Sequence, residues 1–117
     1  MKYKIIIKRN LLSKINPSIR GLTLYPFILL RHHYLKTDRV LINHEKIHLQ
    51  QQLELLIIPF YIIYIINYLL NIIIYRSHFK AYYHIIFERE AYSNELDLDY
   101  LKKRQMFAFL KYIKKPS

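Results

Sequence analysis

The spacing of apolar residues changes along the chain, and its first part predicts a small β element. Residues 1–36 contain isoleucines at 5–7 and a second apolar run over 22–30. Short apolar and β-branched runs bounded by turn residues favour strands. Pro26 lies inside the second run, and a proline cannot donate a ladder hydrogen bond. We therefore expect an N-terminal β element with an edge strand near residues 22–30.

The pattern after residue 37 predicts helices. Asp38 provides an N-cap side chain, and apolar residues continue at helical spacing without a breaker until Pro59. A proline removes one helical hydrogen bond and clashes with the preceding turn. We expect one helix over 38–58, a chain reversal at Ile58 and Pro59, and a second, strongly apolar helix over 60–75.

The remaining chain predicts a third helix and a basic tail. A break at residues 76–78 precedes a predicted helix over 79–96, and 97–117 reads as a basic amphipathic segment. With one glycine, four prolines and no internal repeat, residues 1–117 are expected to form a single domain. The expected fold class is mainly α with a small N-terminal β element, an α+β arrangement.

Two histidines lie four positions apart inside the first predicted helix. His44 and His48 share one helix face, and Glu45 flanks them. Two imidazoles at this spacing can hold one Zn²⁺, which takes nitrogen and oxygen ligands. In a catalytic site, a neighbouring carboxylate takes a proton from the water that the metal acidifies. We therefore expect Glu45 to be the general base, with an accidental histidine spacing as the alternative hypothesis.

A third ligand is expected from the helix predicted over residues 79–96. Glu88 shares a helix face with Ala91 and Glu95, whereas Glu90 lies about 200° away from Glu88. Only one of the two glutamates, Glu88 or Glu90, can therefore face the histidines. Ala91 is a small residue that would let the two helices approach closely, and it lies nearer in angle to Glu88. We predict Glu88 as the third ligand and keep Glu90 as the alternative.

These residues resemble a known pattern. His44-Glu45-x-x-His48 followed by Glu88-x-x-Ala91 looks like the gluzincin pattern of zinc metallopeptidases. The closest variant is that of the integral-membrane prenyl-protein and heat-shock endopeptidases, and the beta-lactam-sensor peptidases are similar in plan. The resemblance implies a zincin-like helical core, His44, His48 and Glu88 as zinc ligands, and Glu45 as the base.

The chain departs from that pattern at Tyr92, where the resembled endopeptidases carry an aspartate. That aspartate accepts a hydrogen bond from a ligand histidine and fixes its tautomer, so the corresponding partner here is weaker or comes from elsewhere. Gln51 and Gln52 follow the histidines, and their amides either bond a ligand or the opposite helix or form an exposed polar patch. His84 is considered either as a group that polarises a substrate oxygen or as a structural histidine.

The charge and hydropathy of the chain indicate where the protein acts and what it binds. Residues 55–75 carry no charged side chain, although the chain has a net charge of +11. Three short helices can bury only part of this apolar run, and a basic protein is attracted to anionic lipid. We expect a membrane-associated or cytoplasmic protein without a secretory signal, with a membrane surface as one partner. The scattered basic residues form no recognisable nucleic-acid-binding module, so no specific nucleic-acid partner is expected.

Together these features predict a zinc-dependent metallopeptidase that hydrolyses peptide bonds in a peptide or protein substrate, with Zn²⁺ as its cofactor. An extended substrate can add to the edge strand near residues 22–30. The alternative is a small membrane-associated protein with a non-catalytic metal site or an accidental histidine spacing. The absence of cysteine excludes disulfides and thiolate ligands. The sequence predicts no particular oligomeric state.

Overall fold

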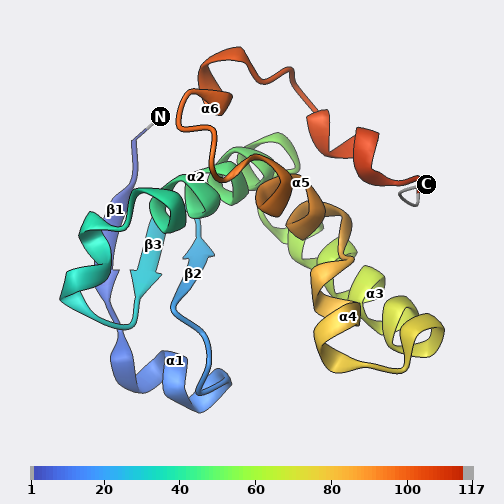
Figure 1. Ribbon diagram of the computed structural model, residues 1–117, viewed down its shortest axis with the longest axis horizontal. Coiled ribbons are helices and arrows are strands. Elements are labelled where there is room, and N and C mark those ends of the chain that lie inside the picture. Colours follow the sequence, from blue (N-terminus) through green and yellow to red (C-terminus); the bar gives the residue numbers. More distant parts are fainter. Residues whose placement is uncertain (1, 115–117) are drawn as a thin grey trace.

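The computed structural model describes residues 2–114 and is mainly helical with a small three-stranded sheet near its N-terminus (Figure 1). The expected fold class is thus confirmed. The elements in chain order are β1 (Lys4–Ile7), α1 (Arg9–Ile15), β2 (Gly21–Leu24), β3 (Phe27–Leu30), the 3-10 helix η1 (His33–Thr37), α2 (Arg39–Glu54), α3 (Ile58–Tyr75), α4 (His78–Tyr83), α5 (Ile86–Asn94), α6 (Tyr100–Lys103) and the 3-10 helix η2 (Ala108–Tyr112).

The sheet has the order β1-β3-β2, with β1 parallel and β2 antiparallel to β3. The prediction of one strand near residues 22–30 was wrong in detail, because Tyr25 and Pro26 form the turn of a β2–β3 hairpin. A turn accommodates a proline without the loss of a ladder hydrogen bond. The central strand is therefore β3, and β2 is an edge strand.

The first helix, α1, was not expected, because residues 1–36 were interpreted as a β element. Only Leu12 of its seven residues is buried, so the helix adds little apolar surface to the core. Leu12 is completely buried. Tertiary packing, rather than a local pattern, stabilises a helix this short.

Helix α2 begins as predicted, because Asp38 caps it and Asp38 Oδ1 accepts a hydrogen bond from the Leu41 amide at 3.0 Å. It ends at Glu54, earlier than expected, and the chain reverses through Leu56 and Ile57, both with a φ of 61°. The predicted position of the reversal, at Ile58 and Pro59, was therefore wrong: the chain turns two residues earlier. Pro59 lies in the first turn of α3, where the missing amide hydrogen would have no helical partner in any case.

The helix predicted over 79–96 is interrupted, and α4 and α5 replace it. Ile85 is fully buried at the break, and the Ile86 amide donates to Asn67 Oδ1 at 2.8 Å instead of continuing a helix. The segment predicted as basic and amphipathic over 97–117 contains two short, separate elements, α6 and η2. Residues 115–117 lie outside the described range.

Two apolar clusters flank α2. One joins the sheet, η1 and α2 around Ile28, Leu30 and Leu49; the other joins α3, α5 and η2 around Phe60, Phe87 and Phe109. In Figure 1, α2 crosses the molecule between the sheet and the hairpin of α3 and α4, with α5 beside it. This arrangement places one face of α2 against α5 and another against β2.

Candidate metal centre

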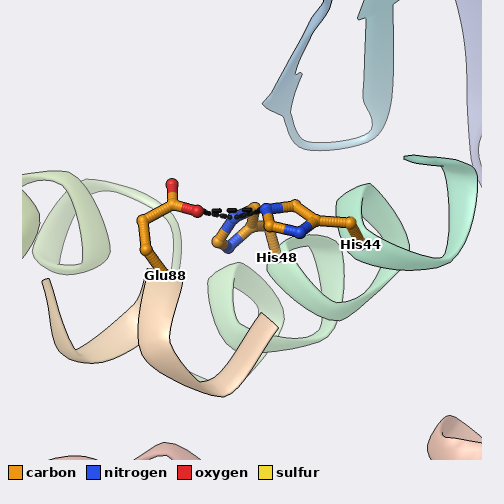
Figure 2. Close-up of side chains that lie close together, drawn as sticks. All are labelled: His44, His48 and Glu88. Carbon is orange, nitrogen blue, oxygen red and sulfur yellow. Dashed lines mark hydrogen bonds and ion pairs between the residues drawn. The ribbon is translucent and has the colours of Figure 1, made fainter. Parts of the chain in front are cut away.

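Three side chains from α2 and α5 converge in the interior. His44 and His48 project from neighbouring turns of α2, and Glu88 reaches them from the first turn of α5 (Figure 2). Glu88 Oε1 lies 3.0 Å from the Nε2 atoms of both histidines, and these two Nε2 atoms are 3.2 Å apart. The structure thus brings together the three residues predicted as ligands.

The spacing of these atoms fits a small divalent cation. Four ligands at about 2.0–2.1 Å around tetrahedral zinc lie about 3.3–3.4 Å from each other. The three observed separations of 3.0–3.2 Å are close to those edges. All three side chains are less than a tenth exposed. Imidazole nitrogen and carboxylate oxygen are donors that suit Zn²⁺.

The second ring nitrogen of each histidine has a hydrogen-bond acceptor. His44 Nδ1 donates to Glu95 Oε1 at 3.1 Å, and His48 Nδ1 donates to Gln51 Oε1 at 2.8 Å. The Gln51 amide is oriented by its own nitrogen, which donates to Phe87 O and to a Glu90 oxygen. With hydrogen on both Nδ1 atoms, the Nε2 lone pairs are directed at the shared site.

Glu88 is held at both carboxylate oxygens. Oε1 faces the histidines, while Oε2 accepts a hydrogen bond from the Tyr64 hydroxyl of α3 at 2.7 Å. Burial by itself would raise the pKa of Glu88, but the charge of His48 and hydrogen bonds from both imidazoles hold that pKa well below its usual range. Burial lowers the pKa of His48, yet the neighbouring Glu88 carboxylate outweighs it and raises that pKa to about 9.

Glu45 lies on the sheet side of α2. Its Oε2 accepts a hydrogen bond from the Thr23 hydroxyl of β2 at 3.1 Å. A Cβ atom on Gly21 would lie 3.5 Å from Glu45 Oε1, so β2 passes close to this carboxyl. Burial raises the pKa of Glu45, and the nearby charges of His48 and His44 oppose that rise. A carboxyl with a raised pKa is suited to exchange protons near neutral pH.

The alternative ligand Glu90 does not reach the histidines and instead joins a buried ion-pair network. Arg104 Nε donates to Glu90 Oε2 at 2.5 Å, and Arg104 Nη1 donates to Glu54 Oε2 at 2.7 Å. The Tyr100 hydroxyl also donates to Glu90, at 2.6 Å. Burial raises the pKa of Glu90, but Arg104 and the hydrogen bonds from Gln51 and Tyr100 lower it overall. Glu90 is therefore charged, and it ties α5 to α2 and to the segment after α6.

The other residues considered from sequence have separate positions. Gln52 accepts from the Tyr25 amide and donates to Thr23 O, so it links α2 to the hairpin of β2 and β3. Tyr92 packs edge-on against the His44 ring, with ring centroids 4.5 Å apart. His84 bonds the Lys80 carbonyl and stacks on Tyr75, a structural position away from the three ligands.

Three further residues contact the centre. Glu95, on the same helix face as Glu88, was a candidate third ligand from sequence; it instead supplies to His44 the carboxylate that the resembled endopeptidases carry at the position of Tyr92. Tyr64 and Thr23 could not be singled out from the sequence. The chain has twelve tyrosines, and Thr23 reaches Glu45 only because β2 packs on α2.

Comparison with known proteins found no match: no protein-family model, no curated protein and no solved structure corresponds to this chain.

Proposed function

We propose that the protein is a zinc-dependent metallopeptidase, with His44, His48 and Glu88 as ligands. The observation that carries this proposal is the meeting of two Nε2 atoms and one carboxylate oxygen at tetrahedral spacing, with acceptors on both Nδ1 atoms. The resemblance of these positions to the gluzincin pattern supports it. Zinc bound by three protein ligands lowers the pKa of a bound water to near neutrality and polarises a carbonyl.

The side chains of this site have distinct roles in the proposal. Glu45 takes a proton from the attacking water and passes it to the leaving amine, which its raised pKa and its position between β2 and the histidines favour. Glu95 and Gln51 orient the two imidazoles. Tyr64 holds the outer oxygen of Glu88 and so limits rotation of that carboxylate.

An extended peptide would bind along β2, which pairs with β3 on one side only. The Thr23 carbonyl is already bonded to the Gln52 amide and the Tyr61 hydroxyl. The open part of this edge is therefore near Gly21, where a Cβ atom would lie 3.5 Å from Glu45 Oε1. Strand addition there would bring a peptide carbonyl to the general base.

The proposal also includes a place of action for the protein. Among residues 2–114, α3 is the one helix whose length and composition would allow it to cross a membrane. Only 11% of its eighteen residues are buried. This agrees with a cytoplasmic or a membrane-associated protein, and we propose that the peptidase works at a membrane.

The test combines metal analysis with one matched pair of variants. Purified protein should contain one zinc per chain, and Glu88→Ala should lose it. Glu45→Gln should keep the zinc and lose cleavage of an unstructured test protein such as casein, because the base is removed without a change of shape. Lys46→Gln, a neighbour on a different face of α2, should keep both. Absence of stoichiometric zinc in the unaltered protein would contradict the proposal.

A non-catalytic zinc site is the second candidate, and the deep burial of all four polar residues favours it, since Glu45 and the three ligands are each less than a tenth exposed. Structural zinc sites are closed by a fourth ligand, whereas catalytic sites keep one position open. Zinc-loaded protein that cleaves no protein substrate, and whose Glu45→Gln variant behaves identically, would establish this second function instead.

A further inference from the structure

Helix α3 carries its polar groups on the side that faces the rest of the protein. On a helical projection the residues of this side fall within an arc of about 120°. Each of the two asparagines has a partner inside the molecule: Asn67 accepts from the Ile86 amide at 2.8 Å, and Asn71 donates to the Ala81 carbonyl at 3.1 Å. Tyr61, Tyr64 and Tyr68 direct their hydroxyls to Thr23, Glu88 and His78.

The opposite side of α3 consists of aliphatic side chains alone and covers an arc of about 180°. No hydrogen-bonding side chain interrupts this surface, and Ile73, its most exposed residue, is 72% exposed. We call this surface the aliphatic face; it consists of Ile62, Ile63, Ile65, Ile66, Leu69, Leu70, Ile73 and Ile74.

This distribution is the reverse of an ordinary surface helix, in which the apolar stripe faces the core and polar residues face water. Polar groups that face inward and find protein partners, with an aliphatic exterior, are what a hydrocarbon surrounding requires. A patch for a protein partner normally has aromatic or arginine anchors within it, and the eight residues of the aliphatic face include none. Lipid therefore fits this surface better than a second protein.

Length and charge agree with a lipid partner. Eighteen residues extend about 27 Å at 1.5 Å per residue, close to the thickness of about 30 Å of a bilayer core. Beyond the C-terminal end of α3, Arg76 and Lys80 are exposed cations, and Phe79 beside them is 70% exposed. Cations and aromatic rings at the end of an apolar helix are placed to contact headgroups. The net charge of +11 favours an anionic membrane.

We propose that the aliphatic face of α3 is embedded in the hydrocarbon of an anionic lipid membrane, with Arg76 and Lys80 at the headgroups. The inward face of the same helix carries Tyr64, which bonds the proposed metal ligand Glu88. The membrane and the metal centre are thus separated by the width of one helix. The lipid contact itself does not depend on peptidase activity.

The chain contains no tryptophan, so one introduced indole reports on its own surroundings. Leu69→Trp places it on the aliphatic face, and Tyr34→Trp places it on η1, where Tyr34 is 70% exposed. The full-length protein is mixed with vesicles of phosphatidylcholine and phosphatidylglycerol that carry bromine on the acyl chains. Emission from Leu69→Trp should shift to the blue and be quenched by bromine, while emission from Tyr34→Trp should stay red and unquenched.

Sedimentation with unlabelled vesicles of the same composition gives the second readout. Ile66→Asp combined with Leu69→Asp should reduce the fraction bound by at least about tenfold, because a carboxylate in hydrocarbon is costly. Tyr34→Asp is the matched control and should bind as the unaltered protein does. Circular dichroism and zinc content of the double variant should be unchanged, which separates loss of lipid binding from loss of fold or of the metal centre.

Two results would overturn the proposal. Equal quenching of both indoles, or equal vesicle binding by the double variant and the unaltered protein, would mean that α3 does not enter the lipid. A blue shift of Leu69→Trp that appears without lipid and grows with protein concentration, with no bromine quenching, would show that a second copy covers the aliphatic face instead.

Discussion

At the scale of single residues, the metal centre depends on which atom of each side chain carries a hydrogen. Glu95 and Gln51 accept from the two Nδ1 atoms, so both Nε2 atoms face one oxygen of Glu88. Without a cation, three atoms with lone pairs would crowd at 3.0–3.2 Å. Burial lowers the pKa of His48, but the Glu88 carboxylate favours its protonated form and raises that pKa to about 9.

Gln51→Met should weaken zinc binding by about 10- to 100-fold, the range for loss of a hydrogen-bond partner of a metal ligand. The thioether cannot hold the Nδ1 hydrogen of His48 as the amide oxygen does at 2.8 Å. Competition with a fluorescent zinc chelator measures the affinity. Gln50→Met is the control, since Gln50 is half-buried next to Gln51 and takes part in none of the hydrogen bonds described for His44, His48 and Glu88. Equal affinities of the two variants would contradict this role.

The raised pKa of His48 predicts how the stability of zinc-free protein depends on pH. Because the pKa in the folded state is about 9 and the ordinary value is 6.5, the stabilising charge interaction with Glu88 is complete below pH 6.5. It is lost as the pH rises through 9. The free energy of unfolding should fall over this window by on the order of 1–3 kcal/mol.

Urea unfolding between pH 6 and 9.5 measures this change for protein stripped of metal by a chelator. His48→Gln should remove most of the slope, because glutamine does not titrate. A stability that stays constant over the same window in the chelated, unaltered protein would show that His48 does not hold the extra proton.

At the scale of elements, Arg104 joins three segments that are far apart in sequence. Its guanidinium bonds Glu54 at the end of α2 and Glu90 in α5, and the side chain is 2% exposed. Through Glu90 and Gln51 the same network reaches His48. The segment after α6 thereby links the two helices that carry the proposed metal ligands.

Arg104→Met should destabilise the fold by about 3–5 kcal/mol, because it leaves two buried carboxylates without their cation. Lys103→Met is a matched control one residue earlier. The Lys103 side chain is 66% exposed and pairs with Asp97 at the surface, so its loss should cost at most about 1 kcal/mol. Chemical unfolding gives both values, and similar losses for the two variants would refute a central role for the Arg104 network.

At the scale of the whole molecule, the buried apolar residues form two separate clusters. One belongs to the sheet side and the other to the side of α3, α5 and η2. The proposed metal centre lies between α2 and α5, and a bound ion would link these two parts. A ligand that binds only the folded chain stabilises it in proportion to the logarithm of its concentration.

Zinc at about one hundred times its dissociation constant should therefore raise the free energy of unfolding by about 2.7 kcal/mol. Thermal unfolding followed by circular dichroism tests this, with a chelator to reverse the shift. His44→Ala should abolish the shift, whereas His32→Ala, which removes a histidine remote from the centre, should preserve it. An identical zinc-induced shift in both variants would mean that the ion binds elsewhere.

Local spacing determined what could be predicted from sequence alone. The four-residue separation of His44 and His48 defines a common helix face, and the angle between Glu88 and Glu90 allows only one of them to point the same way. Asp38 as an N-cap and the mainly helical fold follow from equally local rules. These features depend on interactions within a few residues, so they can be read without knowing the fold.

Tertiary structure alone decided the rest. The break at Ile85 and the helix α1 arise where burial of Ile85 and Leu12 outweighs local helical or strand preference. The turn at Leu56 and Ile57 places two non-glycine residues at positive φ, which no local pattern of the sequence indicates. The partners of Glu45 and Glu88 come from β2 and α3, and their approach depends on how separate elements pack. Packing energy is shared among many distant contacts, and no short stretch of sequence contains it.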